Sequence, residues 1–355
     1  PGCTNCYAMG MAARLQAISD SWHKEGALHL THYAGTTVRT KAGAAWSGKL
    51  MVAPEHVFTQ PLHWRRPRRI FVNSMGDLFH EGHPEEAIDH AFAVMALAPQ
   101  HTYMVLTKRS ARMRDYVGTR AGDWMLHWPD AARKAGALLG DVAALGAVPF
   151  PLPNVWLGVS TEDQRRADER VPDLLATPAA IRFISAEPLL APIDLTCVGN
   201  LTTVRAAMPS IVAREERGRP TSGNGSISGF QVEAIGRAGS SIEFFQTPDH
   251  MGGFSASSPR RYPRLDLVIA GGESGPKARP MHPDWARSLR DQCAAAGSAF
   301  FFKQWVEHIT AAWAPSHIPI SHAFDDGYQM IRVGKRAAGR RLDGVEHNAM
   351  PEARS

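Results

Sequence analysis

Six short apolar runs, mostly separated by helical patterns, constrain the fold of this 355-residue chain more than any other feature. The runs are residues 70–74, 103–106, 155–159, 181–184, 265–269 and 299–302. Each reads as a strand buried on both faces, and helices between such strands are typical of a parallel sheet. With one more strand expected upstream, the pattern favours an α/β fold that is a partial or complete (β/α) barrel of the TIM type over a flat doubly wound sheet.

Polar residues fall at or just after the carboxyl end of every run. They are Asn73, Ser74, Asp77, Lys108, Ser160, Glu162, Ser185, Glu187, Glu273, Ser274, Lys303 and Gln304. In β/α barrels the carboxyl ends of the strands carry the active site. Polar residues are also common in ordinary loops, but their recurrence after six strands predicts an active-site rim.

Several local signals set the expected helix boundaries. A helix is predicted from Ser110 to about Val117, where Gly118 ends it. Residues 161–164 form a capping box that opens another helix, which Pro172 kinks or ends. A third helix begins at Pro283 and is closed by a glycine.

The segment before the first run gives weaker signals. Residues 49–52 predict a short strand, and Pro54 starts a helix to about Trp64. Four arginines follow within residues 65–69, and we interpret them as a solvated helix end that leads into a strand, with phosphate contact as the alternative. A further strand is predicted at residues 329–333.

The expected organisation is one barrel domain, residues 1–305, and a C-terminal extension, residues 306–355. An insertion at residues 199–262 interrupts the barrel between the late strands, and its centre is rich in glycine and serine. Such a composition predicts flexible parts, either a lid or an irregular excursion.

Two cysteines near the start, Cys3 and Cys6, precede an apolar pattern with helical spacing. A helix N-terminus stabilises thiolates, so this pair suits half of a zinc site, a redox motif or part of an iron–sulfur cluster. Cys197 and Cys293 lack the close pairing of a structural zinc site, and Cys293 lies on the apolar stripe of a predicted helix as a core residue. The residues alone leave these three alternatives open.

Bulk composition excludes some classes of protein. Four cysteines are too few for a disulfide scaffold, which favours a reducing, cytoplasmic location. No signal-peptide pattern and no apolar run of membrane-spanning length is present, so no membrane contact is expected. The net charge is +5, and 31 of the 39 basic residues are arginine. This composition permits contact with nucleic acid, but it also fits a general genomic preference for arginine.

Seven ordered blocks carry a resemblance to a known family. They are residues 2–8 (GCTNCYA), 71–80 (FVNSMGDLFH), 106–109 (LTKR), 156–160 (WLGVS), 185–189 (SAEPL), 271–275 (GGESG) and 302–305 (FKQW). Together they resemble a family of phage and prophage proteins of unknown function with an N-terminal three-cysteine motif. The resemblance runs from Pro1 to about Trp305, leaves out the insertion, and returns at residues 334–344.

That family in turn resembles radical S-adenosylmethionine enzymes, which have a partial (β/α) barrel and a cysteine-rich loop. The resemblance implies a [4Fe–4S] cluster on three thiolates, S-adenosylmethionine on the open iron, and an electron donor. One electron then cleaves the cofactor, and the resulting adenosyl radical abstracts a substrate hydrogen; the protein supplies placement and shielding.

Carried over to this chain, Cys3 and Cys6 are two of the cluster ligands, and the first cysteine is expected upstream. The implied cofactor residues are Ser74, Gly76 and Asp77 for the methionine end, Ser160 and Glu162 for the ribose, and Gly271, Gly272, Glu273 and Ser274 for the adenine. Lys108, Glu187, Lys303 and Gln304 are expected to face the substrate as catalytic residues.

Two other functions compete with this one. A zinc-dependent or metal-free barrel hydrolase would use Glu187, Glu273 and Lys303. A non-catalytic phage accessory protein would bind nucleic acid through its net positive charge. The substrate itself is not identified, and a nucleic acid or nucleotide is the candidate.

Overall fold

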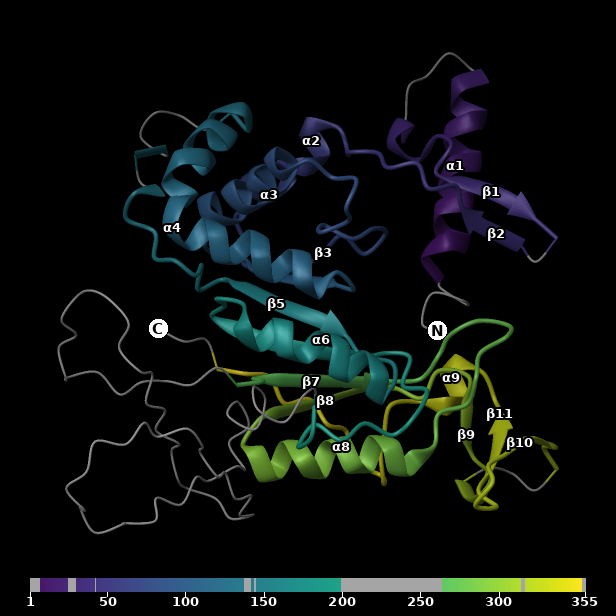
Figure 1. Cartoon of the computed structure of the whole chain (residues 1–355). Helices are drawn as coiled ribbons and strands as arrows, with labels where there is room; N and C mark the ends of the chain where they lie inside the picture. The colour runs from purple at the N-terminus through teal and green to yellow at the C-terminus, as the bar shows by residue number, and fades with distance from the viewer. Residues whose placement is uncertain are drawn as a thin grey trace, which may run out of the picture.

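The centre of the molecule is a parallel sheet of six strands in the order β3-β4-β5-β6-β7-β8. The computed structural model describes residues 7–24, 30–41, 43–136, 142–143, 145–198, 264–313 and 317–352. The strands are β3 (Arg69–Val72), β4 (Thr102–Thr107), β5 (Val155–Ser160), β6 (Ile181–Ala186), β7 (Leu267–Gly271) and β8 (Ala299–Gln304). The sheet curls into a half-barrel (Figure 1), so the prediction of a partial (β/α) barrel is confirmed.

Helices cover the outer face of the sheet. They are α3 (Glu85–Leu97), α4 (Ser110–Lys134), α6 (Gln164–Ala176) and α8 (Pro283–Ala296). Helix α6 contacts β5 and β6, and α8 contacts β7 and β8. The main core lies between these helices and the sheet, where Trp128, Phe79 and Phe302 are fully buried.

A second, smaller core lies on the inner face of the sheet. Trp156, Ile181, Phe183 and Leu267 form it, with Met104, Leu106, Ile269 and Phe301 packed against them. Alternate residues of a strand point to opposite faces. Strands β4 to β8 therefore send one set of apolar side chains to the helices and the other set to this inner cluster, to which β3 contributes no residue.

Smaller elements flank the half-barrel at both ends of the chain. The N-terminal group comprises α1 (Tyr7–Lys24), η1 (Thr31–Tyr33), the antiparallel pair β1 (Thr37–Thr40) and β2 (Gly43–Trp46), α2 (Glu55–Phe58) and η2 (Gln60–His63). The C-terminal group comprises β9 (His308–Thr310), η4 (Ala311–Trp313), β10 (Ile320–Ala323), β11 (Gln329–Arg332) and α9 (Lys335–Ala338). In Figure 1 both groups lie near the carboxyl ends of the sheet strands. Elements α1, β1 and β2 lie on one side, and β9–β11 and α9 lie on the other. The strand predicted at 329–333 is confirmed as β11.

The chain end forms a cover over the free edge of β8. The Phe302 amide donates to the His347 carbonyl at 3.0 Å, and Phe301 forms an antiparallel bridge with Asn348. Met350 packs against the inner cluster. The C-terminal segment therefore belongs structurally to the half-barrel.

Helix α4 does not end at Gly118, as the sequence predicted, but continues to Lys134. The part of α4 after Gly118 buries Arg120 and Trp128, and the Arg120 guanidinium pairs with buried Asp89 at 2.7 Å. Glycine in a helix interior costs only about 1 kcal/mol relative to alanine. This burial and pairing outweigh that cost, so the prediction was wrong.

Helix α6 also departs from its predicted ends. It passes through Pro172 to Ala176, and its N-cap is Asp163, whose carboxylate accepts the Arg166 amide at 2.9 Å. Thr161 cannot open the helix because its amide still donates to the Ser185 carbonyl across the sheet at 2.9 Å.

The strand predicted at 49–52 is absent from the described structure, where these residues are exposed and have no strand partner. The helix predicted from Pro54 to Trp64 is divided into α2 and η2. Pro61 has no amide hydrogen to continue α-helical bonding, which explains the break. The insertion at 199–262 lies outside the described residues.

Candidate active site

The register of the sheet brings the polar strand ends to one edge. Ser160 pairs with Ser185, and Thr107 pairs with Val159, which sets Lys108 beside Ser160. Because the strands are parallel, the residues that follow them all emerge at their carboxyl ends. The structure thus places the twelve polar residues named from the sequence along one edge of the half-barrel.

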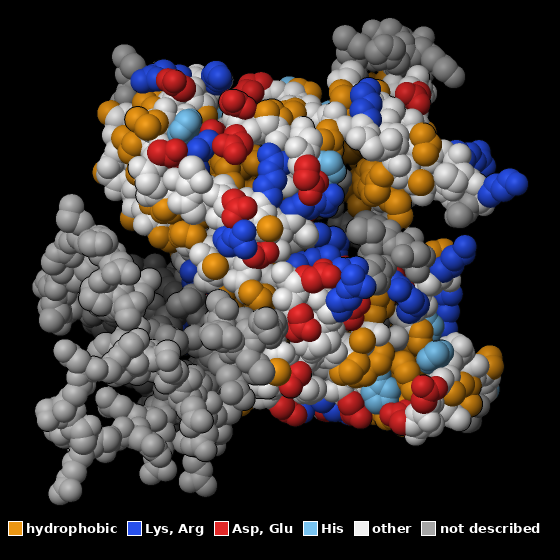
Figure 2. All heavy atoms as spheres, viewed as in Figure 1, with side chains coloured by type: hydrophobic (Ala, Val, Ile, Leu, Met, Phe, Trp, Pro, Cys, Tyr) orange, Lys and Arg blue, Asp and Glu red, His pale blue; other side chains and the backbone are white. Residues whose placement is uncertain are grey.

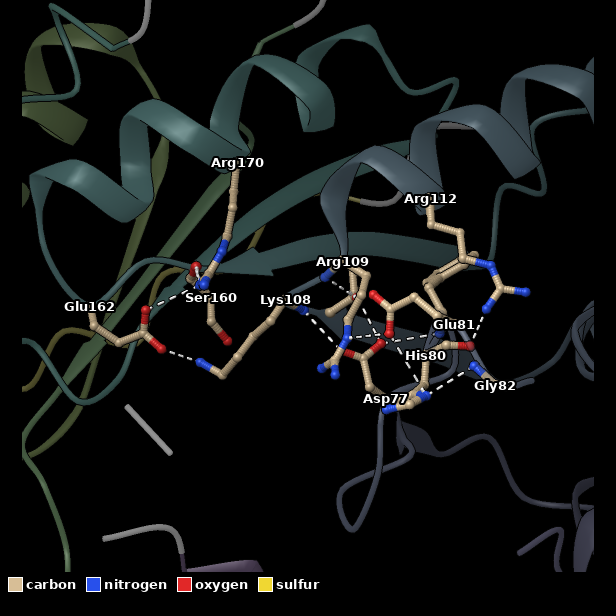
Figure 3. Close-up of polar contacts among 12 residues, drawn as sticks. Asp77, His80, Glu81, Gly82, Lys108, Arg109, Arg112, Ser160, Glu162 and Arg170 are labelled. Carbon is tan, nitrogen blue, oxygen red and sulfur yellow. Dashed lines mark hydrogen bonds and ion pairs between the residues drawn. The ribbon is translucent and has the colours of Figure 1, made fainter. Parts of the chain in front are cut away.

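A buried glutamate between two cations is the most enclosed part of this edge. The Lys108 ammonium donates to Glu162 Oε1, and Arg170 Nη1 lies 3.1 Å from Oε2 (Figure 3). The Glu162 side chain is 1% exposed, against 26% for Lys108 and 12% for Arg170. Burial favours the protonated carboxyl, but the two positive charges outweigh it and hold the pKa of Glu162 below its ordinary value. Glu162 is therefore an ionised carboxylate whose two oxygens are already bound.

The loop after β3 turns sharply toward β4. Asn73 has a left-handed φ of 58°, and its carbonyl accepts the Gly76 amide at 3.0 Å. Asparagine is one of the few residues that adopts this conformation at low cost. The turn leaves Ser74 exposed and brings Asp77, three residues further on, over the end of β4.

Asp77 joins the first two strand ends. Its Oδ1 accepts the Thr107 hydroxyl at 2.6 Å, and its Oδ2 accepts the Lys108 amide at 3.0 Å and Arg109 Nη1 at 3.1 Å (Figure 3). These bonds use both carboxylate oxygens within the protein. Asp77 accordingly fixes the position of Lys108, whose side chain then reaches Glu162.

On the opposite side of the edge, Glu187 pairs with Lys303. The Lys303 ammonium donates to Glu187 Oε2 at 3.1 Å, and the side chains are 53% and 17% exposed respectively. Burial raises the pKa of Glu187, while Lys303 and Lys335 act against the rise. Burial prevails because the exposed lysine is screened by water. A Cβ on Gly271 would lie 2.5 Å from the other carboxylate oxygen, so a larger residue there would require the Glu187 side chain to move.

Glu273 is committed to an internal ion pair. Arg279 binds its Oε2 through the amide at 2.8 Å and Nε at 2.9 Å, and its Oε1 through Nη2 at 2.6 Å. A Cβ on the preceding Gly272 would lie 2.2 Å from the Trp305 carbonyl oxygen. Close packing within the protein therefore already accounts for small residues at 271 and 272, and contact of these glycines with adenine stays a prediction.

Among the predicted cofactor and catalytic residues, four polar side chains are unpaired within the described ranges; Ser160 is buried and the other three are at least partly exposed. Ser74, Ser160, Ser274 and Gln304 form no side-chain hydrogen bond within the part of the chain that the structure describes. Three hydroxyls and one amide, beside two lysines that reach solvent, can bind a ligand that carries both donors and acceptors.

The sequence pattern did not predict the two arginines that neutralise Glu162 and Glu273. Arg170 lies on α6, eight positions after Glu162, and Arg279 stands six positions after Glu273. The first spacing gave no helix-face signal, because Glu162 precedes the Asp163 N-cap and is not part of α6. The second offered none, since it depends on how the loop before α8 folds.

The predicted cluster ligands Cys3 and Cys6 lie outside the described residues, and α1 begins directly after them at Tyr7. In the described ranges, no three His, Cys, Asp or Glu side chains lie together as a metal site requires. Cys293 is buried, as predicted, and burial raises the pKa of its thiol to about 12. Cys197 is exposed.

A protein-family model described as "Protein of unknown function (DUF5131)" matches residues 1–351. No curated protein and no solved structure matches the chain. Within the described residues, no helix is long and apolar enough to cross a membrane.

Proposed function

Because the chain belongs to the DUF5131 family, whose description names no activity, we propose from its own residues that it is a radical S-adenosylmethionine-type enzyme. Cys3 and Cys6, with a third thiolate, would hold a [4Fe–4S] cluster, and the carboxyl edge of the half-barrel would hold the cofactor and substrate. When bound, cluster and cofactor together supply reductive cleavage of a sulfonium, followed by hydrogen abstraction.

One observation carries the proposal. Six parallel strands end in polar residues at a single edge of a half-barrel, and the helix that follows the cysteine pair lies near that edge (Figure 1). Active sites of β/α barrels occupy this edge, and cluster-binding loops need to stand over it to serve a substrate bound there.

The chemistry of the donor set suits a zwitterionic cofactor. S-adenosylmethionine carries an ammonium, a carboxylate, ribose hydroxyls and a base, and the edge offers both charges beside unoccupied hydroxyls. Ser160 would bind the ribose next to Glu162, while Ser74 would meet the methionine end. Lys108 and Lys303, both partly exposed, would orient the substrate.

The test is anaerobic reconstitution of the full-length protein with iron and sulfide. The expected product is brown, contains about four irons per chain, and releases 5′-deoxyadenosine when reduced in the presence of S-adenosylmethionine. The double variant C3A/C6A should lose the iron, whereas C197A, an exposed cysteine far along the chain, should keep it. A colourless, iron-free protein after reconstitution would overturn the proposal.

A hydrolase is the second candidate, favoured by the Glu187–Lys303 pair. A carboxyl with a raised pKa beside a lysine can transfer protons without a cluster. Glu273 contributes less than the sequence suggested, because Arg279 binds both of its oxygens. Zinc, or no metal, in elemental analysis of an active preparation would favour this function over the first.

A further inference from the structure

Four arginines without acidic partners stand together just before the half-barrel begins. Arg65, Arg66 and Arg68 lie between η2 and β3, Arg69 is the first residue of β3, and all four are exposed. Within the described residues none of them forms an ion pair. Over α3, α4 and α6, by contrast, Lys and Arg side chains lie beside Asp and Glu (Figure 2), as in Arg114–Asp115 and Arg165–Glu169.

The loop that carries these arginines is anchored by hydrogen bonds to His101 and Gln100. Buried His101 accepts the Arg68 amide at Nδ1, 3.2 Å away, and its Nε2 lies 3.0 Å from the Pro61 carbonyl. Since Nδ1 accepts, Nε2 carries the proton and donates. The Gln100 amide also donates to the Trp64 carbonyl at 3.2 Å. A loop tied at both ends loses little entropy when it binds a partner.

An aromatic ring completes the surface. The Arg68 guanidinium lies 4.1 Å from the centroid of the Trp64 ring, and Trp64 is itself partly exposed. A stacked indole and guanidinium offer flat faces to a base, while the neighbouring guanidinium groups match phosphate geometry.

We propose that this arginine loop, residues 64–69, binds the phosphodiester backbone of a nucleic acid. Four like charges within five residues repel one another, and a polyanion relieves that repulsion. The flat Trp64–Arg68 face favours nucleic acid over an acidic peptide or an anionic membrane, which present no planar groups. The four arginines are exposed and lead into β3, as the sequence predicted, and the proposal adds a ligand for them.

The surface is distinct from the candidate active site. Arg69 begins β3 at its amino end, whereas the polar edge lies at the carboxyl end beyond Val72. Four residues of strand, from Arg69 to Asn73, span about 13 Å. A bound strand could therefore extend from the loop toward the edge, but the inference does not rest on the proposed activity, because binding requires neither cluster nor cofactor.

Fluorescence anisotropy with a labelled oligonucleotide, single-stranded or duplex, tests the proposal without added cofactor. Four phosphate contacts predict a logarithmic salt slope of about −3 for a single strand, or about 50-fold weaker binding between about 50 and 200 mM salt. The R65Q/R66Q variant should reduce that slope by about 1.4. The W64A variant should weaken single-strand binding by about 5-fold or more through lost stacking.

The matched control is R133Q/R165Q, which removes two exposed arginines that are ion-paired on helices. It changes the net charge equally and should leave the slope unchanged. Circular dichroism melts confirm that all variants fold. Three outcomes overturn the proposal: no binding at about 50 mM salt, equal slopes for wild type and R65Q/R66Q, or tighter binding to polyglutamate or anionic vesicles than to nucleic acid.

Discussion

Glu162 and Glu187 each follow a strand of the same sheet, yet their surroundings shift their pKa values in opposite directions. Glu162 is enclosed with two cations, Lys108 and Arg170, which stabilise its charge. Glu187 faces the water-screened Lys303, so burial dominates. At this edge the number and exposure of the counter-charges decide the protonation of each carboxyl, and burial alone does not.

Replacing Glu162 by glutamine should lower the free energy of unfolding by about 3 kcal/mol at pH 7, because two cations would then face each other unbalanced. A lowered folded-state pKa contributes stability above the unfolded pKa of about 4.3, and that stability is lost as the pH falls through the folded pKa. Denaturant titrations of wild type and E162Q should therefore differ most at neutral pH and converge in acid. A constant difference across pH would contradict this assignment.

Replacing Glu187 by glutamine should have the opposite pH dependence. A raised folded-state pKa contributes stability below the unfolded pKa, and that stability is lost as the pH rises through the folded pKa. Loss of the exposed pair with Lys303 costs at most about 1 kcal/mol. At pH 7 E187Q should thus be at least nearly as stable as wild type, and its relative stability should fall toward pH 4. A neutral-pH loss as large as that of E162Q would show that Lys303 dominates instead.

At the scale of the elements, the packing of β5 against β6 depends on a glycine, which has no side chain. Gly158 pairs with Phe183, and a Cβ on Gly158 would lie 2.5 Å from two atoms of the buried Phe183 ring. The small residue on one strand makes room for the large residue on the next, as packing of an inner barrel face requires.

The G158A variant should lose about 1–3 kcal/mol of unfolding free energy through overpacking. Adding F183L should recover part of that loss, giving a favourable coupling in a double-mutant cycle. The control is G118A in α4, where no atom lies within 4 Å of the added Cβ. That substitution should stabilise by about 0.5–1 kcal/mol. Additive effects of G158A and F183L would contradict the proposed contact.

At the scale of the whole molecule, the chain end closes the exposed side of the half-barrel. Asp343 accepts Arg287 Nη2 at 2.7 Å and Arg290 Nη1 at 2.8 Å, and these arginines hold the pKa of Asp343 below its ordinary range. The Trp305 indole donates to the Arg341 carbonyl at 2.8 Å. Helix α8 and strand β8 are thereby both tied to the same C-terminal segment.

Ending the chain after Ala338 should expose the edge of β8 and the inner cluster. We expect a melting temperature lower by about 5 °C or more and increased binding of an apolar dye. Ending the chain after Pro351 removes only residues beyond these contacts and should change neither. An unchanged melting temperature for the shorter chain would mean that the segment is not part of the folded core.

Local pattern was enough to predict the six strands, their parallel order and the polar edge. Apolar runs, alternation with helices and strand-end polarity are properties of neighbouring residues. Burial was not predicted as well, because β3 was expected to be a buried strand and its Phe71 is 46% exposed. Helix ends were predicted less well: α4 passes Gly118 because long-range burial outweighs local propensity, and α6 continues through Pro172 to Ala176, so the predicted alternative of an end at Pro172 is wrong. The prediction of a strand at 49–52 was wrong because a strand needs a neighbouring strand to pair with, and a local sequence pattern does not show whether one is present.

The sequence by itself determined which residues reach the carboxyl edge, because strand polarity places them there whatever the details of packing. Only the tertiary structure decided which charges meet. Lys108 and Glu162 are 54 residues apart, and Glu187 and Lys303 are 116 apart. Ion pairing depends on separation in space and on exclusion of water, and the curl of the sheet sets both.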